Sequence, residues 1–163
     1  MGLYSAESIT NEIKLAKSAL VLFNHVCRGA GSSADDSKDI GKEEAMKRVG
    51  DYAKPFIINN AAAYYANNYS YCLESILTDF FNRKKIKDIY NHDANKWTKI
   101  EARGVYKFNK QNEIAIASDS NPGDFYRTSY VNGKKKEEKV KGFKDYDVAY
   151  VGNPNFTVND FFK

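Results

Sequence analysis

The sequence predicts an α+β fold, in which three or four N-terminal helices pack on a C-terminal antiparallel meander of four or five strands. Apolar residues recur at helical spacing before about Asn95 and alternate with polar residues after it. The second half also carries two strong turn signals, Asn121-Pro122-Gly123-Asp124 and Asn132-Gly133. The chain of 163 residues is long enough for one domain with a real core, so we expect residues 1–163 to form a single domain.

The helical part is expected over residues 5–90, and its first helix runs from about Ser5 to Arg28. Ser5 is a suitable N-cap, and Gly29 provides a left-handed position after the last turn. Between these ends the apolar residues recur at helical spacing, at Ile9, Ile13, Ala16, Leu20 and Phe23.

Residues 29–41 are expected to form a mobile surface loop, because they hold small residues and aspartates and have little to bury. A short helix over Lys42–Asp51 follows. Pro55 suits the first turn of a buried helix that reaches about Tyr65. The last expected helix runs from Ser70 to about Tyr90.

The sheet part is expected over residues 97–151. Its strands are predicted over residues 99–108, 114–116 and 125–131, then from Lys134 after the Asn132-Gly133 turn, and finally over 146–150. The strand from Lys134 has charge on both faces, which is typical of a solvated edge strand. Residues 153–163 are too apolar for a free tail and should dock on the body or on a neighbouring subunit, with these residues as a candidate interaction surface: Phe156, Val158, Phe161 and Phe162.

The composition excludes few classes of function. The net charge of +4 and the isoelectric point near 8.9 are mildly basic, and lysine far outnumbers arginine, which favours solubility over specific base readout. Twelve tyrosines suit either half-buried core edges or a recognition surface. No apolar run approaches the ~20 residues that a membrane-spanning helix requires, so we expect no membrane span.

Cys27 and Cys72 both fall in expected helices and allow two interpretations. They are either two buried free thiols, which would indicate a cytoplasmic protein, or one disulfide. A Cys27–Cys72 disulfide would indicate an extracellular or surface location. Two cysteines outside a C-x-x-C pair cannot form a zinc site by themselves, and we expect neither a metal nor a cofactor.

No set of residues with catalytic spacing is evident, so we predict no catalytic residues. His25 and Cys27 point to different sides of a helix, and His92 lies roughly 30 Å along the chain from Cys72 if the helix continues. Motifs for phosphate loops, zinc proteases and calcium loops are not found.

The order of helices followed by a sheet is similar to that of small microbial ribonucleases. Glu101, Glu113 and Arg127 offer a general base and a cation for such chemistry, but no histidine follows His92. Carboxylates for a two-metal nuclease could come from the second half, although turn formation and charge balance also explain them: Asp119, Asp124, Glu137 and Glu138.

Two basic patches are candidate contacts for anions or nucleic acid. One comprises Arg83, Lys84, Lys85 and Lys87, and the other comprises Lys134, Lys135 and Lys136. Lysine clusters raise affinity for phosphates without reading sequence. Neither patch is interleaved along the chain with aromatic residues that could stack on bases.

The segment from Ala6 to Leu20 resembles the distal part of the spine helix of type IV pilin-like proteins, which also place a sheet after that helix. The resemblance covers about the first 25 residues and implies an extracellular filament or surface subunit.

Taken together, these features favour a non-enzymatic interaction or structural protein that binds another protein or copies of itself. The alternatives are the pilin-like subunit and a nucleic-acid binder or metal-dependent nuclease.

Overall fold

The computed structural model describes residues 6–26, 29–33, 36, 38–69, 72–119 and 123–162. In chain order the elements are α1 (Ala6–Glu12), β1 (Ala19–Asn24), α2 (Gly41–Ile58), β2 (Ala61–Asn67), α3 (Leu73–Phe81), α4 (Ile86–Trp97), β3 (Thr98–Val105), β4 (Glu113–Asp119), β5 (Gly123–Val131), β6 (Lys134–Phe143), β7 (Tyr146–Gly152) and the 3-10 helix η1 (Val158–Phe162).

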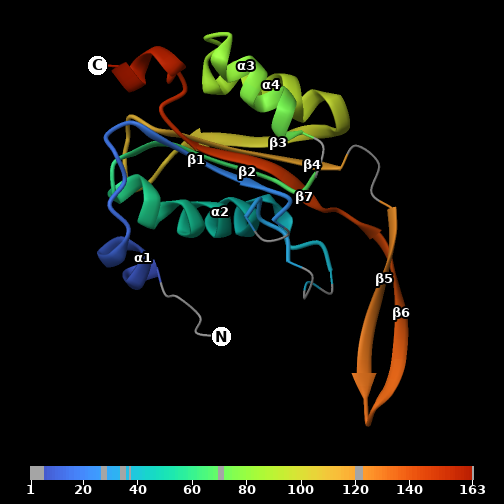
Figure 1. Cartoon of the computed structure of the whole chain (residues 1–163). Helices are drawn as coiled ribbons and strands as arrows, with labels where there is room; N and C mark the ends of the chain where they lie inside the picture. Colours follow the sequence, from blue (N-terminus) through green and yellow to red (C-terminus); the bar gives the residue numbers. More distant parts are fainter. Residues whose placement is uncertain are drawn as a thin grey trace.

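A five-stranded sheet in the order β1-β2-β7-β4-β3 forms the centre of the protein. β1 and β2 are parallel, and the other neighbouring pairs are antiparallel. α2 connects the two parallel strands and covers one face of the sheet, while α3, α4 and η1 cover the other (Figure 1). A parallel pair needs such a crossover, so the order β1-α2-β2 is one βαβ unit in an otherwise antiparallel sheet.

Each face of the sheet has its own apolar core. On the α2 side, Phe23, Phe56 and Tyr64 pack with ring centroids 5.5 to 6.0 Å apart. On the α3–α4 side, the ring of Tyr90 lies 4.9 Å from that of Tyr150. Tyrosine is the dominant large core residue, and among the described residues the following tyrosines are fully buried: Tyr64, Tyr65, Tyr90, Tyr106, Tyr146 and Tyr150. At least half of the twelve tyrosines of the chain therefore contribute to the core.

The mixed α+β class and the mostly antiparallel sheet are confirmed, but the placement of the helices before the sheet is wrong. The predicted helix over residues 5–28 is two elements, α1 and β1, separated by a turn in which Ser18 has φ +65°. The run Ala19–Phe23 is short and apolar, and such a run satisfies a buried strand as well as a helix. Its pairing partner β2 lies about 40 residues away in the sequence, so local periodicity could not identify it as a strand.

The next expected helices are also rearranged. The short helix and the helix beginning at Pro55 are one helix, α2, with Pro55 inside it, and residues Ala61–Asn67 form the interior strand β2 instead of a helical turn. The expected helix over residues 70–90 is split into α3 and α4, because Arg83 adopts φ +65° between them.

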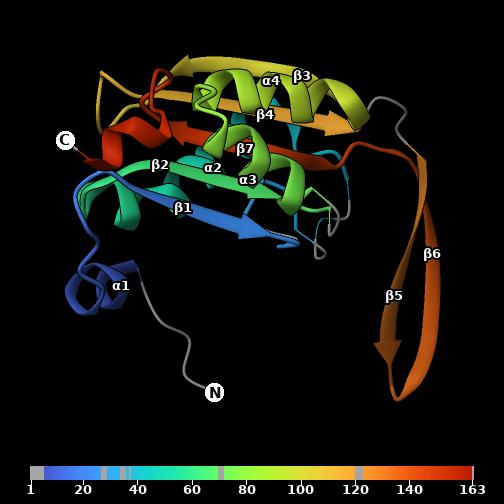
Figure 2. The same ribbon diagram turned by 45° about the horizontal axis from the view of Figure 1, so that its top comes forward.

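Strands occur where alternation predicted them in the second half, but they do not form one meander. β3, β4 and β7 join the central sheet, whereas β5 and β6 form a separate two-stranded sheet that extends away from the body (Figures 1 and 2). Within the described residues, no helix is both long enough and apolar enough to span a membrane.

Candidate functional site

The most distinctive surface feature is the β5–β6 hairpin, residues 123–143, which we term the arm. Its strands pair from Gly123–Phe143 to Val131–Lys134, and the tip is the predicted Asn132-Gly133 turn. Both tip residues have positive φ, 51° and 74°, which is the requirement of a two-residue type I′ turn. Asn132 and Gly133 tolerate this conformation, so the sequence alone specifies the tip.

The arm carries most of the net charge of the protein. It holds six lysines and arginines and three acidic residues, a net charge of +3, compared with +4 for the whole chain. The remaining 142 residues are therefore close to neutral. A projecting ribbon with this excess of positive charge attracts polyanions over a distance of about one Debye length.

Cross-strand register places aromatic and basic side chains on one face of the arm. Tyr126 is opposite Lys139, and Tyr130 is opposite Lys135. The pair between them on the same face is Thr128–Glu137, and Glu137 forms an ion pair with Lys135 at 2.7 Å. The Lys139 Nζ atom lies 5.8 Å from the centroid of the Tyr126 ring. Tyr126 and Tyr130 are 59% and 72% exposed. The aromatic interleaving that the linear sequence lacks is therefore created by pairing of the two strands.

The two predicted basic patches are not brought together. Lys87 of the first patch pairs with Glu113, the first residue of β4, at 3.4 Å, whereas the arm begins beyond Asp119 at the other end of that strand. Lys84 is paired with Asp79 at 2.8 Å. The first patch thus lies at the opposite end of the sheet from the arm and is partly neutralised.

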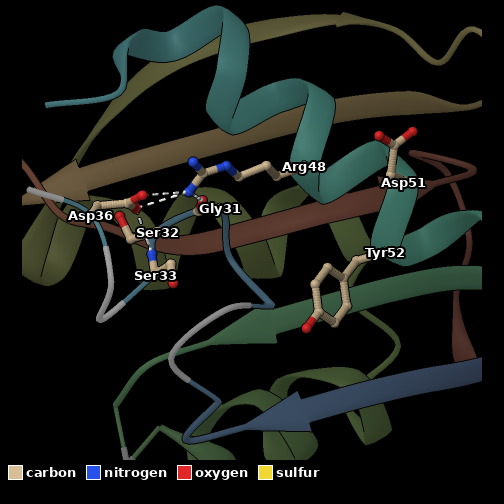
Figure 3. A pocket seen from close by; sticks show the side chains of 7 residues that line it. All are labelled: Gly31, Ser32, Ser33, Asp36, Arg48, Asp51 and Tyr52. Atoms are coloured by element: carbon tan, nitrogen blue, oxygen red, sulfur yellow. Dashed lines mark hydrogen bonds and ion pairs between the residues drawn. The ribbon is translucent and has the colours of Figure 1, made fainter. Parts of the chain in front are cut away.

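A cavity of about 420 Å³ lies between the β1–α2 segment and α2 (Figure 3). Arg48 dominates it, with Nη1 2.8 and 2.9 Å from the two carboxylate oxygens of Asp36 and with Nε 3.0 Å from Oε1 of Glu44. The guanidinium is thus balanced by two carboxylates, and the cavity offers no excess charge to an anion. The segment was expected to be an exposed loop, but Ala30 and Ser32 are buried.

Three aspartates, Asp119, Asp145 and Asp147, flank the two chain segments from which the arm emerges. The Tyr69 hydroxyl lies 3.2 Å from Oδ2 of Asp147 and 3.4 Å from Oδ1 of Asp119, and Asn68 donates its side-chain amide to Oδ1 of Asp147. Burial raises the pKa of Asp147 to about 7, and the negative charges of Asp145 and Asp119 contribute to this rise against the opposing effect of the Asn68 hydrogen bond. Burial also raises the pKa of Asp145.

This cluster does not form a metal centre. In the part of the chain that the structure describes, no three His, Cys, Asp or Glu side chains are grouped closely enough to hold an ion. The other nuclease candidates are also dispersed: Glu137 lies on the arm and pairs with Lys135 at 2.7 Å, and nothing is described of the side chain of Asp124.

The ribonuclease candidates are likewise engaged in separate ion pairs. Glu101 accepts a hydrogen bond from Ser118 and pairs with Lys144 at 3.3 Å. Glu113 is bound by Arg103 at 2.7 Å and by the Tyr150 hydroxyl at 2.6 Å. The side chain of Arg127 lies outside the described residues.

The thiols and histidines do not form a nucleophilic site. Cys72 is free and buried, and burial raises the pKa of its thiol to about 12, with the nearby Asp93 adding to this effect. Cys27 lies outside the described residues. His92 contacts Asp79 at 3.2 Å, and Asp79 lies about two helical turns, roughly 10 Å, further along α3 than Cys72, so His92 is not positioned beside the thiol. A thiol with a raised pKa and no access to solvent is a poor nucleophile.

Only part of the predicted interaction surface in the C-terminal tail is exposed. Phe156 is buried against Phe80 with ring centroids 5.5 Å apart, and Val158 is half-buried. Phe161 contacts the same rings but remains 41% exposed, and Phe162 is 85% exposed.

Comparisons of the chain with protein-family models, curated proteins and solved structures give no match, so its function must be inferred from its geometry.

Proposed function

We propose that this protein binds single-stranded nucleic acid through the arm. The observation that carries this proposal is the face on which Tyr126 and Tyr130 alternate with Lys139 and Lys135. Lysines neutralise phosphates, and exposed tyrosine rings stack on unpaired bases, each stacked base contributing roughly 1–3 kcal/mol. In a duplex the bases already stack on one another, so this surface favours single strands.

The shape of the arm supports the same proposal. A two-stranded hairpin by itself is marginally stable in water, and three or more strands or a covering helix are usually needed. The described residues of the arm make their extensive contacts with each other and not with the body. A ligand that covers the exposed tyrosines would supply the burial that the arm lacks.

The test is fluorescence anisotropy with a labelled single-stranded oligonucleotide over a range of salt concentrations. Replacing Lys135 and Lys139, the two lysines on the tyrosine face, by Gln should weaken binding and reduce the slope of log K against log salt by roughly 1.4, at ~0.7 per phosphate contact. The double variant Tyr126→Ala/Tyr130→Ala should weaken single-strand binding at least tenfold and leave the slope nearly unchanged.

The matched control is Arg83→Gln/Lys85→Gln, which removes two charges from the opposite end of the sheet. It should bind as the wild type does. Equal losses in these two charge-removing variants would refute the arm as the contact surface, and salt-insensitive or undetectable binding by the wild type would refute nucleic-acid binding altogether.

A protein-interaction or structural role is the second candidate, favoured by the exposed apolar side chains of Phe81 and Phe162. The pilin-like alternative was based on a single helix over Ala6–Leu20. The structure has no such helix, because α1 ends at Glu12 and Ala19 and Leu20 belong to β1. The other support for that alternative, a Cys27–Cys72 disulfide, stays a prediction, because Cys27 lies outside the described residues.

A further inference from the structure

The two edges of the central sheet differ in charge. The edge strand β3 carries Lys99, Glu101 and Arg103, whereas the edge strand β1, with the sequence ALVLFN, carries no charged residue. Charged residues on an edge strand are a common device against edge-to-edge pairing. The β3 edge has this protection, and the β1 edge does not.

The outer side of β1 lacks a pairing strand. β1 is hydrogen-bonded to β2 on one side, and among the described residues no strand lies on the other. All six of its residues are half-buried rather than fully buried. Backbone groups on an open edge are satisfied either by water or by another strand, and an apolar edge favours the strand.

α3 covers the face of the sheet on which Leu20 and Leu22 of β1 pack, and it carries an exposed apolar stripe. Ile76 and Phe80 are buried toward the sheet, and Asp79 contacts His92 of α4, so α4 lies on one side of the helix. Leu73, Leu77 and Phe81 recur every four residues, so they form one stripe on the side of α3 away from Asp79. In Figure 2, α3 lies nearer to β1 than α4 does.

This stripe lines a shallow depression of about 540 Å³. Leu73 and Phe81 are 37% and 66% exposed, an unusual amount of apolar surface for a helix that also contributes to a core.

We infer that the β1 edge and the α3 stripe form an interface between two copies of this chain. A twofold axis perpendicular to the sheet would pair β1 with β1 of the second copy in antiparallel register and join the two five-stranded sheets into one continuous sheet. The same axis would bring the two α3 stripes together on one face. Because a twofold interface places identical patches opposite each other, an uncharged strand is suited to it, while a charged one would face its own charges.

The inference is independent of the ligand of the arm, and its test uses the protein without nucleic acid. Sedimentation velocity should show a dimer that dissociates on dilution. The variant Leu73→Lys/Phe81→Lys adds two charges per copy to the interface and should weaken association roughly 100-fold. The control Val105→Lys changes a residue that is 68% exposed on the β3 edge, and it should dimerise as the wild type does.

Hydrogen exchange locates the interface without a substitution that could disturb folding. Dilution of the wild type should increase exchange at the outward amides of β1 and leave β3 and the arm unchanged. A wild type that stays monomeric at all concentrations overturns the inference. So does a dimer that persists in the Leu73→Lys/Phe81→Lys variant with its fold intact, or one whose concentration-dependent protection lies in the arm.

Discussion

Replacement of Asp147 by Asn should make the protein more stable above neutral pH. Asp147 is 3% exposed at the start of β7, beside Asp119 and Asp145, and its partners are the Asn68 amide at 3.0 Å and the Tyr69 hydroxyl at 3.2 Å. An asparagine side chain has nearly the same shape and can still accept the hydrogen bond from Asn68. The substitution therefore removes a buried negative charge without creating a cavity.

The magnitude follows from linkage. Burial, together with the neighbouring carboxylates, raises the pKa of Asp147 from 3.8 to about 7. Between these values the folded protein holds a proton that the unfolded chain has released, so the stability contributed by this group falls as pH rises. A shift of this size corresponds to about 4 kcal/mol, developed between about pH 4 and pH 7 and constant above about pH 7.

Urea unfolding at pH 5 and pH 8, followed by circular dichroism, measures the effect. The wild type should lose free energy of unfolding between the two pH values, and Asp147→Asn should lose about 2–4 kcal/mol less. Glu101 and Glu113 have lowered pKa values, so they cost stability only in more acidic solution and do not obscure this window. A wild type as stable at pH 8 as at pH 5, or a variant with the same pH dependence as the wild type, would refute the reasoning.

Three further predictions concern stability and reactivity. Tyr65→Phe should cost about 1–3 kcal/mol in urea unfolding, because it removes the 2.5 Å hydrogen bond that the hydroxyl donates to the buried Asp93 carboxylate, while Tyr130→Phe on the arm should cost almost nothing. Gly152→Ala should lower stability by about 1–3 kcal/mol or more, since its Cβ would lie 2.5 Å from the Ala62 carbonyl oxygen; Gly123→Ala, where a Cβ meets no atom within 4 Å, is the control, and equal melting temperatures would contradict the packing argument. Cys72 in a Cys27→Ser background should react with iodoacetamide far more slowly in folded than in unfolded protein, as followed by intact mass, because burial raises its pKa to about 12; similar rates in both states would show that the thiol is accessible.

Sequence reasoning succeeded where a feature depends on neighbouring residues. The Asn132-Gly133 tip is the clearest case, because both residues accept the positive φ that the turn requires. Alternation also predicts the strands β3, β4 and β7, which the structure contains. These features need only local information, and the mixed α+β class follows from them.

Prediction from the sequence was wrong where a short apolar run is compatible with both a helix and a buried strand. Ala19–Phe23 and Ala61–Ala66 were expected to be helical, but they pair with each other in the sheet interior and at its edge. Apolar composition indicates burial without specifying which backbone conformation achieves it. α2, which separates the two strands in sequence, brings them together in space.

In the candidate site, too, some features could be predicted from the local sequence and others depend on strand pairing. The lysines of the arm are visible in the sequence, but only the register of β5 against β6 places Tyr126 and Tyr130 between them on one face. Likewise, Asp119, Asp147 and Tyr69 are far apart along the chain, and their convergence at the base of the arm results from the order of strands in the sheet.

By itself, the sequence determined the hairpin at Asn132-Gly133, its charge and the mixed α+β class, because turn chemistry and alternation act between residues close in the chain. That this hairpin leaves the central sheet as a separate arm was decided by the tertiary structure. Tertiary structure alone decided that β1 and β2 are strands, that β1 is an uncharged open edge, and that the two basic patches lie at opposite ends of the sheet. The physical reason is that strand pairing satisfies backbone hydrogen bonds between distant segments, and no local pattern specifies which segments those will be.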